Sequence, residues 1–300
     1  MSAKPIEPWR RRLLEAGLFY AAMIWGATFF VVKALVSHIH PLALVGYRFL
    51  LSAALLAPAA ARRRRPAVLL REGIVLGALL MLLYVSQTAG LVFTTASNSG
   101  FITGLFILFV PVLLLFSDKK PGAGQWAAVS LALGGLWMLT GGPRGFNKGD
   151  ALTLIAAFAY AAHLLATDRY VRTDADPLLL AFHQFWFCGA ACILLAWALG
   201  LPLGVGDARS AWTIVFLALF PNLSAFYIQL LAQKHVPPIK VSLIFSLEPV
   251  FAALFAWTLG HESVTAGRAA GGLLIVAAMV AGELSRLDLI RGRRREVLPT

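Results

Sequence analysis

Residues 73–117 read GIVLGALLMLLYVSQTAGLVFTTASNSGFITGLFILFVPVLLLFS, a stretch of forty-five residues without one Asp, Glu, Lys, Arg or His. As a single helix it would be about 68 Å long, roughly twice the hydrocarbon thickness of a bilayer. It must therefore cross a membrane twice. We expect the turn at Phe93–Gly100, where hydroxyl and amide side chains bond locally and glycine relaxes the backbone. The stretch predicts a membrane hairpin with an uncharged, polar tip.

The hairpin also carries polar side chains along its length. A hydroxyl or amide that faced lipid would have no water to bond, so these side chains should face protein or an aqueous cavity. They are Tyr84, Ser86, Gln87, Thr88 and Thr103.

The composition extends the membrane interpretation to the whole chain. Hydrophobic residues make up 59% and charged residues 13% of the sequence, and the mean hydropathy is +0.78, whereas soluble domains have about 25% charged residues. The net charge of +12 does not indicate nucleic-acid binding, because the basic residues stand in short runs between apolar segments. Cys188 and Cys192 lie four residues apart inside one segment, which predicts apolar filling and neither a disulfide nor a metal site. No cofactor is expected.

Ten apolar segments follow one another, and together they predict an all-α membrane protein with ten transmembrane helices. The loops between them are short, so we expect no inserted soluble domain. The segments run Leu13–Val36, Pro41–Ala61, Glu72–Phe93, Ser97–Phe116, Gln125–Gly141, Ala151–Val171, Pro177–Gly200, Trp212–Gln233, Ile239–Leu259 and Ala266–Leu284.

The distribution of Lys and Arg predicts the orientation of these spans, because cytoplasmic loops carry the excess of basic residues. With both termini cytoplasmic, twenty basic residues lie inside and four, namely Arg144, Lys148, Arg209 and Arg268, lie outside. Lys33 and Arg48 lie within spans. We expect a multi-pass protein of the cell inner membrane. The inner residues are Lys4, Arg10, Arg11, Arg12, Arg62, Arg63, Arg64, Arg65, Arg71, Lys119, Lys120, Arg169, Arg172, Lys234, Lys240, Arg286, Arg291, Arg293, Arg294 and Arg295.

The chain also repeats itself at a nearly constant offset. Pro41 recurs as Pro177, 136 residues later, Pro111-Val112 recurs as Pro249-Val250 at 138, and Gly134-Gly135 recurs as Gly271-Gly272 at 137. The repeat divides the chain into two halves of five spans, residues 1–145 and residues 146–300 with a basic cytoplasmic tail. Because five is odd, the second half enters the membrane from the opposite side, as in secondary transporters whose substrate site lies between inverted halves.

At several motifs the sequence resembles the EamA family of the drug/metabolite transporter superfamily. The resemblance covers roughly residues 18–283. Within this family the sequence is similar in particular to amino acid exporters of the YddG type. It implies a ten-helix exporter of amino acids or related metabolites, with a central cavity lined by the first, third, fourth, sixth, eighth and ninth spans. The matching residues are Trp25-Gly26-Ala27-Thr28, Arg48, Gln87-Thr88-Ala89-Gly90-Leu91, Thr94-Thr95-Ala96, Phe101-Ile102, Leu247-Glu248-Pro249-Val250 and Glu262.

Polar and aromatic side chains on common helix faces are the candidates for substrate binding. Hydroxyl, amide and imidazole groups would bond a zwitterion while aromatic walls receive its side chain. Such residues also bond neighbouring helices in many membrane proteins, so both roles stay open for each of them. The candidates are Trp25 and Thr28, Tyr84, Gln87 and Thr88, Tyr160 and His163, with Thr167 on the same face, and Ser242 and Ser246.

Charged residues inside the spans are few. Glu248 lies near the midplane, where an unpaired carboxylate costs about 2.5 to 3.5 kcal/mol, and Arg48 lies at a similar depth by rise-per-residue counting. We expect an Arg48–Glu248 ion pair between the halves, with a proton-carrying Glu248 as the alternative. His163 is a second candidate for proton transfer. Lys33 is expected to reach the headgroups from the outer end of its span.

Sequence motifs distinguish three classes of function for a membrane protein of this kind: an enzyme, a channel or receptor, and a transporter. A membrane enzyme would need convergent catalytic groups, yet the chain has no H-E-x-x-H, no G-x-S-x-G and no paired intramembrane Asp. A channel or receptor would show rings of charge or large extramembrane domains. The sequence also has no P-loop, so the chain does not itself consume ATP. These patterns favour a secondary transporter that is not an enzyme.

We expect the partners to be the lipid bilayer and a small-molecule substrate. Amino acids and similar amphipathic metabolites, exported by alternating access, fit the aromatic walls best. Lipophilic cations or drugs are the alternative, and these predict an unpaired intramembrane carboxylate. The sequence does not fix the oligomeric state and is compatible with a monomer.

Overall fold

The computed structural model describes residues 7–65, 67–114, 122–142, 144–171, 175–236 and 238–296. Phe116, at the predicted end of the fourth span, and the basic residues Lys4, Lys119, Lys120 and Arg172 lie outside the described residues. The described chain is helical, and no strand occurs in it. The elements are α1 (Pro8–Leu35), α2 (Pro41–Ala61), α3 (Leu70–Phe93), α4 (Ala96–Gly104), α5 (Phe106–Leu114), α6 (Ala123–Thr140), α7 (Lys148–Val171), α8 (Pro177–Ala198), α9 (Ala208–Leu217), the π-helix η1 (Ala218–Ser224), α10 (Ala225–His235), α11 (Pro238–Phe245), α12 (Glu248–Thr258) and α13 (Ala266–Glu296).

The ten predicted spans are confirmed, and three of them are broken helices. Eight helical segments are long and apolar enough to cross a membrane, two of them made of consecutive elements: 208–235 (α9, η1, α10) and 240–258 (α11, α12). The other two spans are the α4–α5 pair and α6. The tenth span is longer than expected, since α13 continues past Leu284 to Glu296.

The hairpin turn falls within the predicted segment and is shorter than it. Helix α3 ends at Phe93 and α4 begins at Ala96, so only Thr94 and Thr95 connect them. The Thr95 hydroxyl accepts a hydrogen bond from the Asn98 backbone N–H at 3.2 Å and caps α4. The polar residues of the predicted tip therefore become the first turns of a helix.

Proline explains two of the three breaks. A proline has no N–H for the carbonyl four residues earlier and crowds it, so a helix ends near that carbonyl. Pro221 removes the bond to Leu217, where α9 gives way to η1, and Pro249 removes the bond to Phe245, where α11 ends. The α4–α5 break has no proline at this spacing. There the Leu105 N–H bonds the Ile102 carbonyl at 3.1 Å in a tightened turn.

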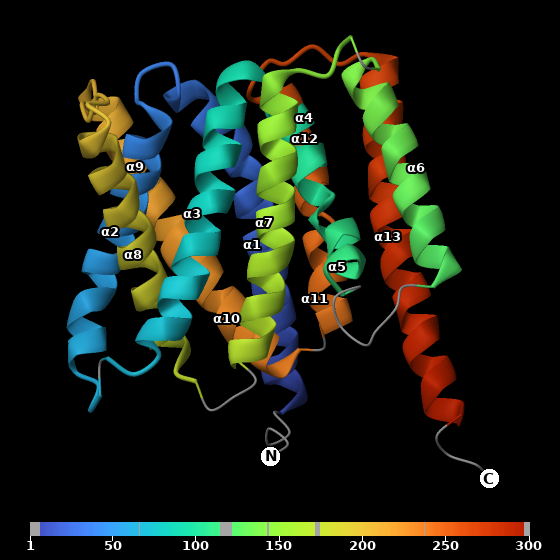
Figure 1. Cartoon of the computed structure of the whole chain (residues 1–300), viewed down its shortest axis with the longest axis horizontal. Helices are drawn as coiled ribbons and strands as arrows, with labels where there is room; N and C mark the ends of the chain where they lie inside the picture. Colours follow the sequence, from blue (N-terminus) through green and yellow to red (C-terminus); the bar gives the residue numbers. More distant parts are fainter. Residues whose placement is uncertain are drawn as a thin grey trace.

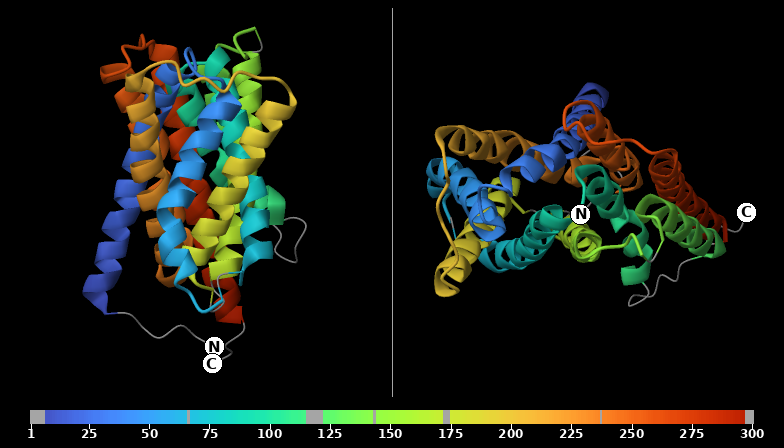
Figure 2. Two further views of the ribbon diagram at one scale, coloured as in Figure 1. Left: turned by 90° about the vertical axis from the view of Figure 1, so that its left-hand side faces the viewer. Right: turned by 90° about the horizontal axis from the view of Figure 1, so that it is seen from above.

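The closest helix pairs join one half of the chain to the other, in a pattern that obeys a pseudo-twofold axis. Second spans pair with each other (α2 with α8), as do fourth (α4 with α12) and fifth spans (α6 with α13). The third span of each half also contacts the first span of the other half: α3 packs against α7, and α10 packs against α1. Figure 2 shows α6 beside α13 at one end of the molecule and α2 beside α8 towards the other. These pairs confirm two inverted five-helix repeats, while their division after residue 145 stays a prediction.

The two ends of the bundle differ in charge. Helix α1 begins and α13 ends at the same end (Figure 1). Exposed arginines of the α1 start and the α2–α3 loop, Arg10–Arg12 and Arg62–Arg65, lie there too, and we call this end the basic face. The α3–α4 turn, the start of α7 and the loop between α12 and α13 lie at the opposite face.

The α6–α13 crossing shows how tightly the halves approach. A Cβ built on Gly135 would lie 2.8 Å from the Gly271 carbonyl oxygen and 3.0 Å from the Ile275 nitrogen. A Cβ on the neighbouring Gly134 would meet nothing within 4 Å. The repeated Gly-Gly pair of the sequence therefore marks a point where two backbones touch.

We predict that Gly135→Ala lowers the stability of the protein by about 1 to 3 kcal/mol, because the added methyl overpacks the crossing. Gly134→Ala is the matched control and should leave stability unchanged or raise it by up to about 1 kcal/mol through better helix propensity. Thermal unfolding of the purified proteins in detergent measures both. Equal melting temperatures for the two variants would contradict this packing.

Candidate functional site

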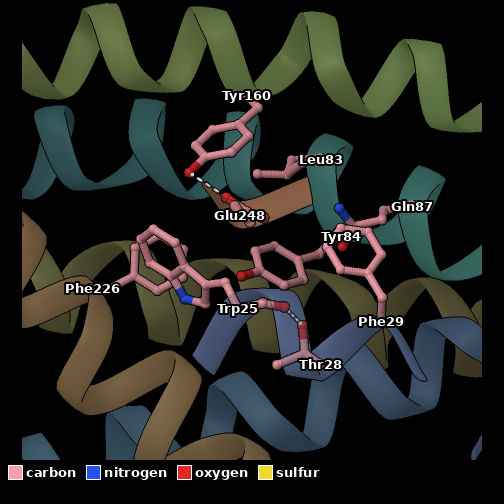
Figure 3. A pocket seen from close by; sticks show the side chains of 9 residues that line it. All are labelled: Trp25, Thr28, Phe29, Leu83, Tyr84, Gln87, Tyr160, Phe226 and Glu248. Carbon is pink, nitrogen blue, oxygen red and sulfur yellow. Dashed lines mark hydrogen bonds between the residues drawn. The ribbon is translucent and has the colours of Figure 1, made fainter. Parts of the chain in front are cut away.

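A narrow cavity lies where the two halves meet, and Figure 3 shows its lining. Its free space is about 20 Å³, which is room for about one water molecule. Five spans build it, namely the first, third, sixth, eighth and ninth. The lining residues are Trp25, Thr28 and Phe29 of α1, Leu83, Tyr84 and Gln87 of α3, Tyr160 of α7, Phe226 of α10 and Glu248 of α12.

Aromatic rings form most of the cavity wall. The ring of Trp25 lies 5.0 Å from that of Phe226 and 6.5 Å from that of Tyr160, centroid to centroid. The Trp25 indole N–H donates to the Pro221 carbonyl at 2.8 Å, and this bond fixes the ring against the π-helix. Phe226 also contacts Tyr84, at 6.1 Å. The wall can receive an apolar or aromatic group and can stabilise a cation over a ring face.

Glu248 supplies the charge of the cavity. It is the first residue of α12, since the helix is interrupted just before Pro249. This places a helix start inside the membrane, and the dipole at a helix start favours a carboxylate. The Tyr160 hydroxyl donates to Glu248 Oε2 at 3.4 Å, and Figure 3 shows the two side chains directed at each other. In the described part of the chain no Lys, Arg or His side chain lies within 4.0 Å of this carboxylate.

The expected Arg48–Glu248 ion pair is therefore wrong. Arg48 is buried, and its Nε and Nη2 donate to the Asn222 amide oxygen at 3.0 and 2.6 Å. Its guanidinium also lies 4.8 Å from the centre of the Tyr84 ring. Counting residues gave the depth of Arg48 but not the direction in which α2 presents it, and η1 brings Asn222 to that side. The bond still joins the first half to the second.

At the opposite face, carboxylates of the second half bond the α3–α4 turn and the start of α4 in the first half. Glu262, in the α12–α13 loop, accepts hydrogen bonds from the Ala96 N–H at 2.5 Å, the Ser97 N–H at 3.1 Å and the Ser97 hydroxyl at 2.6 Å. It thus caps the start of α4 and compensates its dipole. Asp150 accepts a hydrogen bond from the Thr94 hydroxyl at 2.5 Å.

Lys33 also contacts this turn, while its predicted reach to the headgroups stays a prediction. Its ammonium donates to the Leu91 carbonyl at 2.7 Å, near the end of α3. The bond satisfies a carbonyl that the helix end leaves free. The α3–α4 turn is therefore held by acidic groups on one side and by Lys33 on the other.

Five of the predicted binding residues meet at the cavity, namely Trp25, Thr28, Tyr84, Gln87 and Tyr160. Gln87 also donates to the Thr103 hydroxyl at 3.2 Å, which ties α3 to α4. The Thr28 hydroxyl is turned to the Trp25 carbonyl of its own helix, at 2.6 Å. Whether these side chains bind a substrate stays a prediction.

Four predicted binding residues are buried but do not line the cavity: Thr88, His163, Ser242 and Ser246. His163 bonds Gln184, and the Ser246 hydroxyl donates to the Leu243 carbonyl at 2.6 Å. The ninth span breaks after Phe245, so Ser242 of α11 and Ser246 of the turn after it do not continue the helix face that carries Glu248. A straight-helix projection could not show this change of direction.

Sequence reasoning missed Phe29, Leu83 and Phe226 in the lining and Asn222 as the partner of Arg48. The three apolar residues look like any others in a membrane span. Asn222 gave a usable signal, since an amide beside Pro221 within an apolar span marks a broken helix with a polar group in it. The structure also offers no metal site, because no cluster of three His, Cys, Asp or Glu residues occurs in the ranges it describes.

Ten spans in two inverted halves, with broken helices and a pocket between them, define a membrane transporter fold. A solved crystal structure aligns with 90% of this chain and 97% of its own at a TM-score of 0.66, and its 18% identity makes this a likeness of fold alone.

The family follows from sequence comparison. The model of the EamA-like transporter family matches residues 14–141 and 147–281, one match for each half, and the chain belongs to this family. An uncharacterized transporter of Archaeoglobus fulgidus is 31% identical over 90% of this chain and 86% of its own. The uncharacterized inner membrane transporter YedA of Escherichia coli is 26% identical over 84% of each chain. A probable amino-acid metabolite efflux pump of Salmonella typhimurium is 25% identical over 86% and 90%.

We predict that Asn222→Leu destabilises the protein by about 3 to 5 kcal/mol, because it leaves the Arg48 charge buried without its acceptor. Asn222→Asp is the control, since a carboxylate keeps the acceptor and adds an opposite charge. Thermal unfolding in detergent compares them. A leucine variant as stable as the aspartate variant would show that Arg48 does not depend on this bond.

Proposed function

We propose that the protein is a secondary transporter that exports amino acids or related small amphipathic metabolites by exposing the central cavity alternately to the two faces. The observation that carries the proposal is the composition of this cavity. One carboxylate, Glu248, and four other hydrogen-bonding side chains lie among the rings of Trp25, Phe29 and Phe226. The four are Thr28, Tyr84, Gln87 and Tyr160. An ammonium group would bind the carboxylate while the apolar part of the same molecule packs against the rings.

The size of the cavity requires a conformational change for transport. In its present form the cavity admits only water-sized groups, so a metabolite enters only after helices move apart. The irregular spans supply places where such movement can occur, because the turns at Leu105 and Ser246–Leu247 and the π-helix η1 interrupt the regular α-helical pattern. Rocking of one inverted half against the other around a fixed site would then expose each face in turn.

The direction of transport rests on charge. Because cytoplasmic loops carry the excess of Lys and Arg, we infer that the basic face is cytoplasmic and that the protein lies in the cell inner membrane with both termini inside. The Glu262 closure would then seal the outer side of the bundle. The name of the Salmonella relative supports export of an amino acid or its derivative.

One observation favours a second candidate, the efflux of lipophilic cations. Such a transporter is expected to carry an unpaired intramembrane carboxylate. Glu248 meets that condition, since its contact is a neutral Tyr160 hydroxyl and Arg48 bonds Asn222 instead. A cation without a carboxylate of its own would place its charge on Glu248 and its apolar body among the rings.

The two candidates are separated by one pair of compounds, L-phenylalanine and 2-phenylethylamine, which differ only by a carboxylate. We predict that proteoliposomes holding the protein accumulate or release labelled L-phenylalanine faster than empty liposomes. Faster movement of the amine and none of the amino acid would favour the cation candidate. Transport of neither, nor of a panel of other amino acids and amphipathic cations, would reject both.

In the same assay we predict that Glu248→Gln lowers transport at least about tenfold, since the amide loses the charge that binds an ammonium group. Glu15→Gln is the control, because Glu15 pairs with Lys240 at the basic face, 2.6 Å away and far from the cavity. Equal losses in the two variants, or none in Glu248→Gln, would remove Glu248 from the binding site.

A further inference from the structure

Between the cavity and the basic face lies a second group of polar side chains that the cavity does not use. They come from three helices of the second half, α7, α8 and α10, and each is at most 3% exposed. We call this group the inner polar cluster. Its members are His163, Thr167, Gln184, Gln229 and Gln233.

The cluster continues two walls of the cavity. Tyr160, His163 and Thr167 follow one another on one face of α7, and Phe226, Gln229 and Gln233 repeat the same i, i+3, i+7 spacing on α10. Tyr160 and Phe226 belong to the cavity. Both α7 and α10 run from the cavity to the basic face. The polar residues of the two helices therefore lie side by side along the way from the cavity to that face.

Contacts and depth support a single cluster. His163 Nε2 lies 2.9 Å from Gln184 Oε1, and the imidazole lies 6.1 Å from the Phe226 ring, centroid to centroid. Helix α10 packs against both α7 and α8. By rise per residue, His163, Gln184 and Gln229 stand about 9 to 12 Å from the basic-face ends of their helices, so they share one level.

The cluster is short of protein partners. Six of its buried polar atoms have none among the described residues: His163 Nδ1, Thr167 Oγ1, Gln184 Nε2, Gln233 Oε1 and both amide atoms of Gln229. Each would destabilise the fold if it stayed dry, because a buried donor or acceptor without a partner has lost its bonds to water. Six such losses in one place are large compared with the marginal stability of an ordinary domain.

Other buried polar groups of the bundle are either bonded to the protein or isolated from one another. Arg48, Asp150 and Ser52 are bonded to the protein, and the remaining unpartnered atoms of Asn98, Asn222 and Trp257 stand on separate elements. The inner polar cluster alone, within the described ranges, gathers many unpartnered atoms on facing helices. This pattern indicates groups that bond something other than the protein.

We propose that the inner polar cluster is a loading site that holds the zwitterionic head group of an amino acid on its way from the basic face to the cavity. The site offers amide oxygens that accept bonds from an ammonium group, and amide and hydroxyl hydrogens that donate to a carboxylate. The cavity, by contrast, presents a carboxylate and no cationic side chain. This inference rests on the proposed export of amino acids and names the residues that would select the zwitterion.

Thiol labelling tests the site without requiring transport. In the full chain with Cys188→Ala and Cys192→Ala, both cysteines being free and buried, Gln229→Cys is compared with Leu230→Cys. Leu230 is the next residue, 1% exposed and packed in the apolar core. We predict that a small membrane-impermeant thiol reagent, applied to the basic face in oriented vesicles, labels position 229 at least about tenfold faster than position 230.

Ligand protection tests the chemistry. L-phenylalanine should slow the labelling of Gln229→Cys severalfold, whereas 2-phenylethylamine should not, because it lacks the carboxylate. Equal labelling at positions 229 and 230, or labelling that L-phenylalanine does not slow while the amine does, would overturn the proposal. Protection by L-phenylalanine in a protein that transports no amino acid would reject the proposed export and its loading step, while showing that the inner polar cluster binds the amino acid.

Gln229→Leu supplies a readout that does not depend on a cysteine. A loading site predicts an unchanged kcat and a KM for L-phenylalanine at the basic face raised about tenfold, with a melting temperature close to that of the parent. A dry structural cluster predicts a clearly higher melting temperature and no change in KM, since leucine removes two unpartnered atoms. That second result would overturn the proposal.

Discussion

Inside a bilayer a polar side chain has no water to bond, and in this protein that constraint ties the two halves together. Arg48 of the first half bonds Asn222 of the second, and Trp25 bonds the Pro221 carbonyl. At the opposite face the first-half residue Ser97 bonds Glu262. Each bond crosses the pseudo-twofold interface, so the interface is held by a few directional contacts within a large apolar packing surface. In the proposed rocking of the halves, such contacts could be exchanged one set at a time, whereas a purely apolar interface would offer no defined alternative.

Proline gives these polar contacts their positions. Pro249 ends α11 and starts α12 at Glu248, which places a carboxylate and a helix start inside the membrane. Pro221 produces the π-helix that carries Asn222 to Arg48 and leaves its own carbonyl to Trp25. Both breaks border the cavity, so the residues that weaken the helices also build the site. The same two prolines therefore determine both the irregular helices and the position of the proposed site.

Much of this architecture could be predicted from the sequence because it follows from length and periodicity. The uncharged stretch 73–117 gave two spans, and the recurring Pro and Gly pairs gave the inverted halves. The common faces of α3 and α7 gave Tyr84, Gln87 and Tyr160 in the cavity. What failed depends on direction around a helix axis: Arg48 and Glu248 share a depth but face different neighbours, and Ser242 and Ser246 precede the break at which α12 begins. Rise per residue fixes height, whereas partners depend on packing and on local unwinding that an ideal helix does not show.

The central claim is that the halves close one face while opening the other, with Glu262 holding the face opposite to the basic one. Distances between spin labels on the third and ninth spans, measured by double electron–electron resonance, test this claim most directly. One pair, at Phe93 and Leu259, marks the opposite face, and one pair, at Arg71 and Lys240, marks the basic face. The account predicts that Glu262→Ala lengthens the first distance and shortens the second. Unchanged distances, or changes of the same sign in both pairs, would contradict it.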